Sequence, residues 1–204
     1  MALIVISGKA RAGKDTLGEI MKQNFKENYF TMAYANELKR ICGKAFELSK
    51  EQLWGDLKEV PDTRYPKKIK WFTAVTGTIT DDMPEQEYWT PREILQHIGT
   101  ESYRAVEDGF WVRQLFKYID RNYLENVIIT DGRFPDEINA VKDKGGIHIR
   151  IMREEEGAAQ GQQHASEVSL DNFDDADYVI QNNGTIAELE VIAEKIIKEI
   201  ENGW

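Results

Sequence analysis

A glycine-bounded loop near the start of the chain constrains the fold more than any other feature of the sequence. Its residues read Gly-Lys-Ala-Arg-Ala-Gly-Lys from Gly8 to Lys14, and they follow a short apolar run at residues 3–7. Apolar side chains then recur at helical spacing, at Leu17, Ile20 and Met21. Glycines let backbone N–H groups converge on phosphate oxygens, and the first turn of the following helix adds partial positive charge. The pattern predicts a buried strand, a phosphate-binding loop and an amphipathic helix.

The loop and the two residues after it form the predicted nucleotide-binding segment, with the Lys14 ammonium directed at the terminal phosphates. The segment consists of Gly8, Lys9, Ala10, Arg11, Ala12, Gly13, Lys14, Asp15 and Thr16. Asp15 stands where this pattern usually has a Ser or Thr whose hydroxyl binds Mg²⁺. Asp15 and Thr16 are therefore the candidate metal ligands, with Asp15 acting through a water. An alternative stays open for Asp15, as a first-turn acid that offsets the helix dipole.

Strand-like and helix-like segments alternate along most of the chain. Strands are predicted at 3–7, 30–34, 127–130, 147–152 and 178–180, and helices at 15–25, 36–48, 90–123, 135–144 and 186–200. The long third helix carries break signals at Gly99 and Gly109, and two helices begin with a capping box, Thr90 with Glu93 and Thr185 with Glu188. This alternation predicts an α/β fold, a parallel sheet with helices on both faces.

Residues 49–90 interrupt the alternation. They contain three prolines, two glycines and six aromatic side chains. We interpret them as an inserted, irregular region, and a structureless stretch of that length is generally functional. Residues 153–170 are polar and small, with Gly157 and Gly161, and they are typical of a glycine-hinged lid.

Composition excludes several classes of protein. The net charge of −10 opposes binding to long nucleic acid, whose phosphates repel such a surface. No apolar run approaches the roughly 20 residues of a membrane span, and the first strand lacks the basic leader of a signal peptide. The single cysteine, Cys42, has no partner for an internal disulfide, which favours a cytoplasmic location. A monomer and a homodimer are both open.

The residues Arg92, Gln96, Gly99 and Thr100 are spaced so that an α-helix would place them on one face. A guanidinium binds phosphate with two hydrogen bonds, and an amide both donates and accepts toward a base edge. A glycine leaves room for a ring or a sugar to approach. The stripe suits a nucleotide, although an ordinary amphipathic helix with a solvated face has the same spacing.

Further candidates lie near the ends of the predicted strands. Asp131 follows a strand, and ligands of parallel sheets bind beyond the carboxyl ends of strands, so Asp131 is a candidate for positioning Mg²⁺ or a phosphate. Arg133 and Arg153 are candidates for neutralising phosphate charge. Trp111 either stacks on a base or belongs to the core, and the sequence by itself favours the core.

Segments spread over most of the chain resemble the bacteriophage-type deoxynucleoside monophosphate kinases, which have the P-loop nucleoside monophosphate kinase fold. The resemblance is carried by Gly8 to Thr16, Pro-Arg-Glu-Ile-Leu-Gln-His-Ile-Gly-Thr-Glu at 91–101, Trp111, Thr-Asp-Gly-Arg-Phe-Pro-Asp-Glu at 130–137 and His-Ala-Ser-Glu at 164–167. It implies ATP, Mg²⁺ and transfer of the γ-phosphate to a deoxynucleoside 5′-monophosphate, and host cytoplasm if the gene is carried by a phage. It also implies a monophosphate site lined by Arg92, Gln96, Gly99, Thr100, Trp111 and Asp131.

These expectations combine into one arrangement. A single domain spans 1–204, with its core at 1–48 and 124–204, an acceptor-binding insert at about 49–123 and the lid at about 153–170. Lys14, Asp131, Arg133 and Arg153 form the expected catalytic set, because phosphoryl transfer depends on positioning and charge neutralisation. Two alternatives stay open. One is a kinase with another phosphorylated acceptor, such as dephospho-coenzyme A or phosphomevalonate, and the other is a nucleotide-dependent switch.

Overall fold

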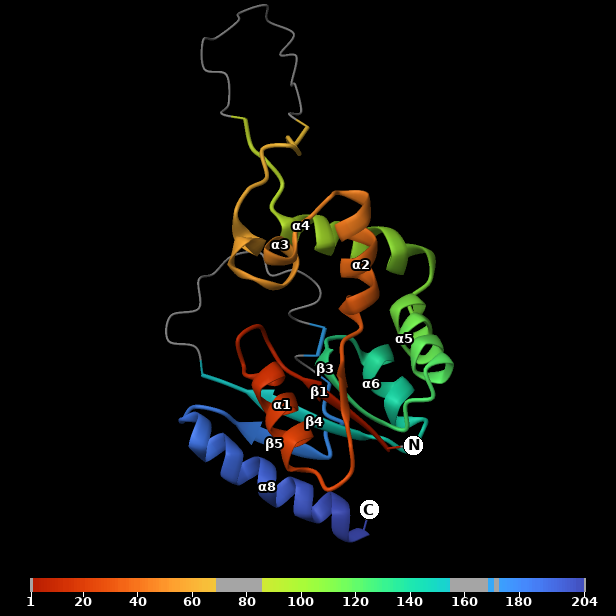
Figure 1. The fold of residues 1–204 in the computed structure, drawn as a ribbon, viewed down its shortest axis with the longest axis vertical. Helices are drawn as coiled ribbons and strands as arrows, with labels where there is room; N and C mark the ends of the chain where they lie inside the picture. The colour runs from red at the N-terminus through yellow and green to blue at the C-terminus, as the bar shows by residue number, and fades with distance from the viewer. Residues whose placement is uncertain (1, 69–85, 155–168, 171–172, 204) are drawn as a thin grey trace, which may run out of the picture. The chain divides into compact units, whose positions relative to one another are not determined.

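The computed structural model describes residues 2–68, 86–154, 169–170 and 173–203, whose helices and strands are labelled in Figure 1. The predicted lid at 153–170, including His164 and Glu167, therefore lies largely outside the described residues. So does the middle of the predicted insert, at 69–85. No helix among the described residues is both long enough and apolar enough to cross a membrane.

A parallel sheet forms the centre of the fold, as the alternating pattern predicted. Within the described residues it has five strands in the order β2-β3-β1-β4-β5, and every pairing is parallel. The strands are β1 (Ala2–Ser7), β2 (Phe30–Met32), β3 (Asn126–Gly132), β4 (Ile147–Met152) and β5 (Tyr178–Gln181). Each predicted strand is present, and β3 continues past Asp131, with which the predicted strand closes, to Gly132.

Helical segments connect and flank the strands. They are α1 (Lys14–Asn24), α2 (Ala35–Ala45), α3 (Lys50–Trp54), η1 (Asp56–Glu59), α4 (Pro91–Gln96), η2 (His97–Arg104), α5 (Phe110–Arg121), α6 (Pro135–Lys142) and α8 (Ile186–Gly203). Both predicted capping boxes are present, at Thr90 with Glu93 and at Thr185 with Glu188. The described part of the insert is less irregular than predicted, because Ser49 forms a further capping box that starts α3.

The three central strands β1, β3 and β4 are buried on both faces, as expected for a parallel sheet with helices on each side. One face packs on α1 and α8, where Ile4, Ile6 and Ile149 meet Leu17 and Leu189. Helices α6 and α5 lie on the other face. The side chains of Val5 and Ile138 meet there over Gly132, where a Cβ would lie within 2.9 Å of both. Because α1 follows β1 on one face and α6 follows β3 on the other, the neighbouring carboxyl ends of β1 and β3 form a topological switch point. Such a point is where open α/β sheets bind ligands.

The chain divides into two compact units, and their bounds differ from the predicted core and insert. The core unit comprises Met1–Glu37 and Arg104–Trp204, and the insert unit comprises Leu38–Tyr103. Most of α2 belongs to the insert unit because its side chains pack there: a Cβ on Gly43 would lie 2.8 Å from the Leu53 side chain. By contrast α5, predicted as part of the insert, packs on α6 and belongs to the core unit.

The long helix predicted at 90–123 is three segments. After Gln96 the backbone changes to a π-helix, η2, in which the hydrogen bonds run from residue i to i+5. Residues 97–104 therefore have π-helical geometry instead of continuing the predicted α-helix, and Gly99 lies against the Leu38 side chain.

Candidate active site

The loop between β1 and α1 needs glycine at both ends. Gly8 has φ of 152° and Gly13 has φ of 102°, both in the region that favours glycine. Space is equally limiting: a Cβ on Gly8 would lie 2.2 Å from the Ile151 carbonyl oxygen, and one on Gly13 would lie 2.5 Å from Nδ2 of Asn182. The loop therefore fits closely against β4 and the end of β5.

Lys14 is buried, with 8% of its surface exposed, although the sequence predicted a side chain free to reach phosphate. Its Nζ atom donates hydrogen bonds of 2.7 Å to the carbonyl oxygens of both Gly8 and Lys9. The ammonium thus closes the loop from inside while it lies at the first turn of α1. A phosphate group would compete with these carbonyls for the same ammonium.

Two side chains that the sequence analysis missed hold the loop in place. Asn182, one residue beyond β5, donates from Nδ2 to the Ala12 carbonyl oxygen at 2.9 Å. Ser7 precedes the loop, and its hydroxyl lies 2.7 Å from Nε2 of the buried His148. The Asp175 carbonyl oxygen lies 2.8 Å from the other ring nitrogen, so Nδ1 carries the hydrogen and Ser7 donates to Nε2. The only signal for these roles was their position at the ends of predicted strands.

Burial lowers the pKa of His148, which keeps the imidazole neutral in this chain of hydrogen bonds. A neutral ring can accept from Ser7 and donate to a carbonyl at the same time. The contact therefore ties the start of the phosphate loop to residues 175–177, where Asp177 also accepts from the His148 backbone N–H at 2.7 Å.

The candidate metal ligands stand at the first turn of α1. Oδ1 of Asp15 accepts a hydrogen bond of 2.7 Å from the Thr130 hydroxyl, which joins α1 to β3, and Thr16 is exposed. Among the described residues, no three His, Cys, Asp or Glu side chains converge as a metal site of their own. Mg²⁺ commonly uses one or two protein oxygens together with substrate phosphates. Asp15 and Thr16 fit that mode, because the remaining ligands would come from the nucleotide and water.

A cavity of about 330 Å³ opens beside the loop and brings several predicted residues together. Gly8 and Lys9 line it from the loop, and Arg133 and Arg153 line it from the ends of β3 and β4. Arg150, which the sequence analysis did not select, lines it as well. Three guanidinium groups and the loop therefore face one space, which can bind an anion with several phosphates.

Asp131 has a role that the sequence analysis did not foresee. Its Oδ1 accepts from the Tyr34 backbone N–H at 2.7 Å, and its Oδ2 accepts from the Ala35 backbone N–H at 2.9 Å. Both oxygens therefore satisfy donors at the amino end of α2, which have no partner within the helix. Asp131 therefore joins β3 to the start of α2. These two hydrogen bonds give Asp131 a structural role that does not depend on a ligand.

A buried charged cluster supports the Arg133 loop. Arg104 donates from Nη2 to Asp136 Oδ1 at 2.5 Å and from Nη1 to Glu137 Oε1 at 3.4 Å, and its guanidinium stacks 3.8 Å from the Phe134 ring centre. Glu137 Oε2 accepts from the backbone N–H groups of Arg133 and Phe134 at 2.8 and 3.1 Å. Asp136 Oδ2 is buried and has no hydrogen-bond partner among the described residues.

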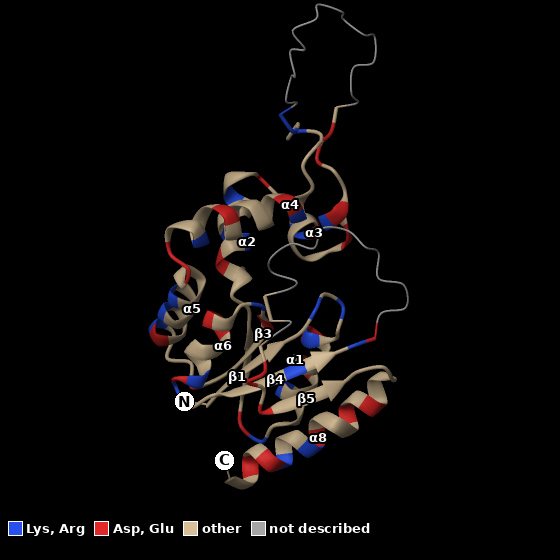
Figure 2. Cartoon of the chain, turned by 180° about the vertical axis from the view of Figure 1, so that it is seen from behind, with Lys and Arg blue, Asp and Glu red and all other residues tan. Residues whose placement is uncertain are grey.

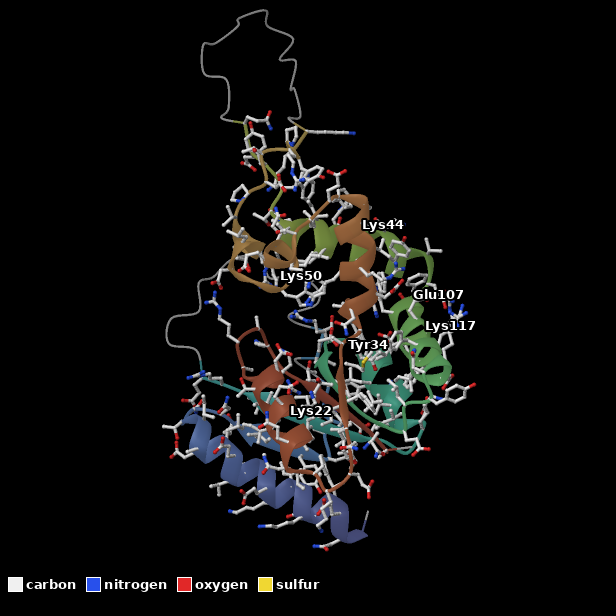
Figure 3. All side chains as sticks on the ribbon, viewed as in Figure 1. Lys22, Tyr34, Lys44, Lys50, Glu107 and Lys117 are labelled. Atoms are coloured by element: carbon white, nitrogen blue, oxygen red, sulfur yellow. The ribbon has the colours of Figure 1, made fainter. Side chains whose placement is uncertain are left out.

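Burial, and next the charge of Asp131, raise the pKa of Glu137 to about 8. Asp136 and Glu137 share the guanidinium of Arg104, and Asp131 adds a third negative charge nearby. A proton retained on Glu137 relieves the repulsion among the three carboxyl groups. Tyr34, labelled in Figure 3, completes the cluster by donating its hydroxyl to the Glu137 carbonyl oxygen at 2.8 Å.

The predicted acceptor residues are divided between the two units. Arg92, Gln96, Gly99 and Thr100 belong to the insert unit, and Trp111 and Asp131 belong to the core unit. In the insert unit, Arg92 pairs with Glu59 through Nε. A Cβ on Gly99 would lie 2.6 Å from the Leu38 side chain, so Gly99 accommodates a core leucine rather than a sugar or ring. Trp111, in the core unit, is 4% exposed and packs edge-on against Phe110, with ring centres 4.8 Å apart. Trp111 is thus a core residue, as the sequence by itself favoured, and is not an exposed stacking surface.

The insert unit has an apolar cavity of about 310 Å³ on another side of α4. It is lined by Phe46, Arg64, Tyr65, Pro66, Trp89, Ile94, His97 and Ile98. Two polar side chains that line the cavity already have partners within the protein. The Tyr65 hydroxyl donates to the Phe46 carbonyl oxygen at 2.6 Å, and Arg64 pairs with Asp62 at 2.6 Å. Neither Arg92 nor Gln96 lines it.

The parallel sheet, the strained glycine loop at its carboxyl edge and the lysine that opens α1 define an α/β protein of the P-loop kinase class. Comparison with known proteins narrows this class. The family model for deoxynucleotide monophosphate kinase matches residues 37–193. The chain is 31% identical to an Acanthamoeba polyphaga mimivirus protein whose name assigns it as a deoxynucleotide monophosphate kinase, over 92% of each chain.

A second relative, the deoxynucleotide monophosphate kinase of Escherichia phage RB69, is 22% identical and aligns with 97% of this chain and 100% of its own length. Among solved structures, dephospho-CoA kinase from Campylobacter jejuni aligns over 98% of both chains with 18% identity and a TM-score of 0.48. The chain belongs to the deoxynucleotide monophosphate kinase family, and it is a kinase that acts in nucleotide metabolism.

Proposed function

We propose that the protein transfers the γ-phosphate of ATP to a deoxynucleoside 5′-monophosphate, giving the diphosphate and ADP. One observation carries the proposal: the phosphate loop and three arginines face a single cavity. An oxygen of the acceptor phosphate attacks the γ-phosphorus, and the bond from that phosphorus to the β-phosphate oxygen breaks. The acceptor is already anionic, so the reaction depends on neutralising charge rather than on a general base.

Each residue has a definite part in this proposal. The loop amides and Lys14 hold the donor phosphates, and Arg133 and Arg153 neutralise the charge that develops during transfer. Mg²⁺ bound through Asp15 and Thr16 would neutralise donor phosphates and orient them. Arg92 and Gln96, which share a helix, are the proposed acceptor ligands, and Arg92 would exchange Glu59 for the acceptor phosphate.

ADP release measured across acceptors tests this function. Wild-type protein with ATP and Mg²⁺ should release ADP with one or more deoxynucleoside monophosphates at least tenfold faster than without an acceptor. Ribonucleoside monophosphates, dephospho-coenzyme A and phosphomevalonate serve as alternative acceptors in the same assay. Release that is equal with and without acceptor would identify a hydrolytic switch, and release that depends on dephospho-coenzyme A or phosphomevalonate would identify a different kinase.

A further inference from the structure

Arg150 lies in the sheet itself, at the level where the phosphate loop begins. In the strand register Arg150 pairs with Ser7 of β1, and Ser7 pairs on its other side with Gly132 of β3. The row Gly132, Ser7 and Arg150 thus crosses three neighbouring strands immediately before the loop glycine Gly8. A side chain from this row projects from the central strands of the sheet, unlike Arg153, which is exposed beyond the end of β4.

The Arg150 guanidinium is held by a backbone carbonyl, and its charge has no counter-charge among the residues that the structure describes. Nη1 donates to the Phe173 carbonyl oxygen at 2.6 Å, and Arg150 forms no ion pair with any residue that the structure describes. The residue is half-buried and lines the cavity beside the loop. Keeping a partly buried charge without a counter-charge is unfavourable, and an anion in the cavity would relieve that cost. Glu154 lies at the same cavity but is exposed and forms no ion pair with Arg150.

A contact of His148 helps to fix the position of the Arg150 guanidinium. His148 is two residues earlier on the same side of β4, and it contacts the Asp175 carbonyl oxygen at 2.8 Å. Together His148 and Arg150 hold residues 173–175 against β4. One end of the guanidinium is therefore occupied by a carbonyl, while Nη2 and Nε remain for a ligand. A preorganised donor of this kind loses little entropy when it binds.

We propose that Arg150 is a phosphate-binding residue of the active site, and that its guanidinium contacts an oxyanion of a bound nucleotide. The inference rests on the proposed function only in the identity of the nucleotide. The same chemistry is offered by the donor triphosphate and by the acceptor monophosphate. Arg150 differs from Arg133 and Arg153 in that it projects from within a strand, so it binds phosphate without a change in backbone conformation.

Three substitutions distinguish the effect of the positive charge of Arg150 from the effect of its hydrogen bond to the Phe173 carbonyl oxygen. Arg150→Gln keeps an amide that can donate to the Phe173 carbonyl but removes the charge, Arg150→Lys keeps the charge, and Arg150→Ala removes both. Arg121→Gln, at the exposed end of α5, changes the net charge equally and serves as the matched control. Calorimetry with ATP and with each deoxynucleoside monophosphate, thermal unfolding and steady-state turnover are measured for every variant.

A charge-assisted contact predicts that Arg150→Gln weakens binding of the contacted nucleotide by about 10- to 100-fold, with little change in thermal unfolding. Arg150→Lys should recover part of that loss, and Arg121→Gln should bind normally. Weaker ATP binding assigns the contact to the donor, and weaker monophosphate binding assigns it to the acceptor. Unchanged binding of both nucleotides in Arg150→Gln would overturn the proposal. If Arg150→Gln and Arg150→Lys lose nucleotide affinity equally and also unfold at a lower temperature, Arg150 has only a structural role. That result would also overturn the proposal.

Two further results keep the proposal testable if the variants do not fold or if the proposed function is wrong. If the variants fail to fold, the Nε–H signal of Arg150 in the wild-type NMR spectrum should shift when ATP or a monophosphate is added, and an unmoved signal refutes the contact. If wild-type protein phosphorylates no deoxynucleoside monophosphate but ATP binding still depends on Arg150, the proposed function fails while the inference about Arg150 stands.

Discussion

At the scale of single residues, Lys14 has a structural role in addition to the phosphate-binding role that we propose for it. A lysine at the end of a glycine loop is expected to serve the ligand, and its removal would then spare stability. In the structure the same ammonium joins two loop carbonyls from a buried position. The sequence pattern places Lys14 at the end of the glycine loop, but only the folded loop reveals that its side chain is buried.

We expect Lys14→Met to lower turnover on the order of 100-fold or more, because the charge opposite the phosphates is lost. The same change should lower the free energy of unfolding by about 1–3 kcal/mol, since two carbonyls lose a charged donor. Lys22→Met, on the exposed side of the same helix (Figure 3), is the control and should leave both quantities nearly unchanged. Denaturant unfolding and ADP release measure the two effects, and a fully stable Lys14→Met protein would contradict the structural half of this prediction.

Glu137 makes stability depend on pH in an unusual direction. Its pKa is raised from an ordinary value of 4.5 to about 8, so between these values the folded protein holds a proton that the unfolded chain has released. The contribution of this group to stability is therefore complete below about pH 4.5 and is lost as the pH rises toward 8. Its slope approaches about 1.4 kcal/mol per pH unit at most.

Glu137→Gln should remove this slope, so that unfolding free energies of variant and wild type diverge across pH 5–8. Glu188 provides a contrast, because hydrogen bonds from Thr185 lower its pKa, and its stabilising effect is lost only as the pH falls below the ordinary range of a carboxyl. Glu188→Gln should therefore leave the slope between pH 5 and 8 intact. Denaturant titrations at each pH give the comparison, and parallel curves for wild type and Glu137→Gln would refute the protonated carboxyl.

At the scale of elements, periodicity and caps predicted far more than side-chain roles. Every strand was predicted because each is a short apolar run, and Thr90 and Thr185 marked helix starts by local chemistry. The π-helix after Gln96 was not predictable from spacing, since its residues also fit an α-helix. The roles of Asp131 and Asn182 escaped prediction because each contacts residues far away in sequence, at Tyr34 and Ala12.

The packing of η2 against α2 gives a prediction at this scale. Gly99→Ala places a methyl group 2.6 Å from the Leu38 side chain, so it should destabilise the protein by about 1–3 kcal/mol. Leu38→Val removes volume at the same contact, and the double variant should recover part of the loss, which a double-mutant cycle detects. If Gly99 instead admits a ligand, Gly99→Ala would raise KM for the acceptor with normal stability, and Leu38→Val would not compensate.

At the scale of the whole molecule, acidic side chains outnumber basic ones, 36 to 26. The net charge is −10, and Figure 2 shows acidic residues along α8. A nucleotide is small enough to respond to the local arginines, whereas a long polyanion meets the field of the entire protein. We therefore expect the protein to bind small phosphorylated ligands in preference to long nucleic acid.

We expect a fluorescently labelled DNA duplex to bind with a Kd weaker than about 10⁻⁴ M at physiological salt, the weak limit of typical non-specific binding. Fluorescence anisotropy in titrations with wild-type protein measures this directly. Binding in the micromolar range that weakens steeply with added salt would show that a basic surface outweighs the net charge.

The lone thiol in α2 has a practical consequence. Cys42 is completely buried in the insert unit, and burial raises its pKa from 9.0 to about 11. The thiolate is the reactive form, so a closed protein should be nearly inert to alkylating reagents at neutral pH. Because no other cysteine is present, each molecule that reacts does so once, and the labelling rate counts openings of α2. The Cys42 sulfur is therefore a natural probe of the insert unit. Comparing its labelling rate with and without nucleotide would measure how substrates change the frequency of local opening in that unit.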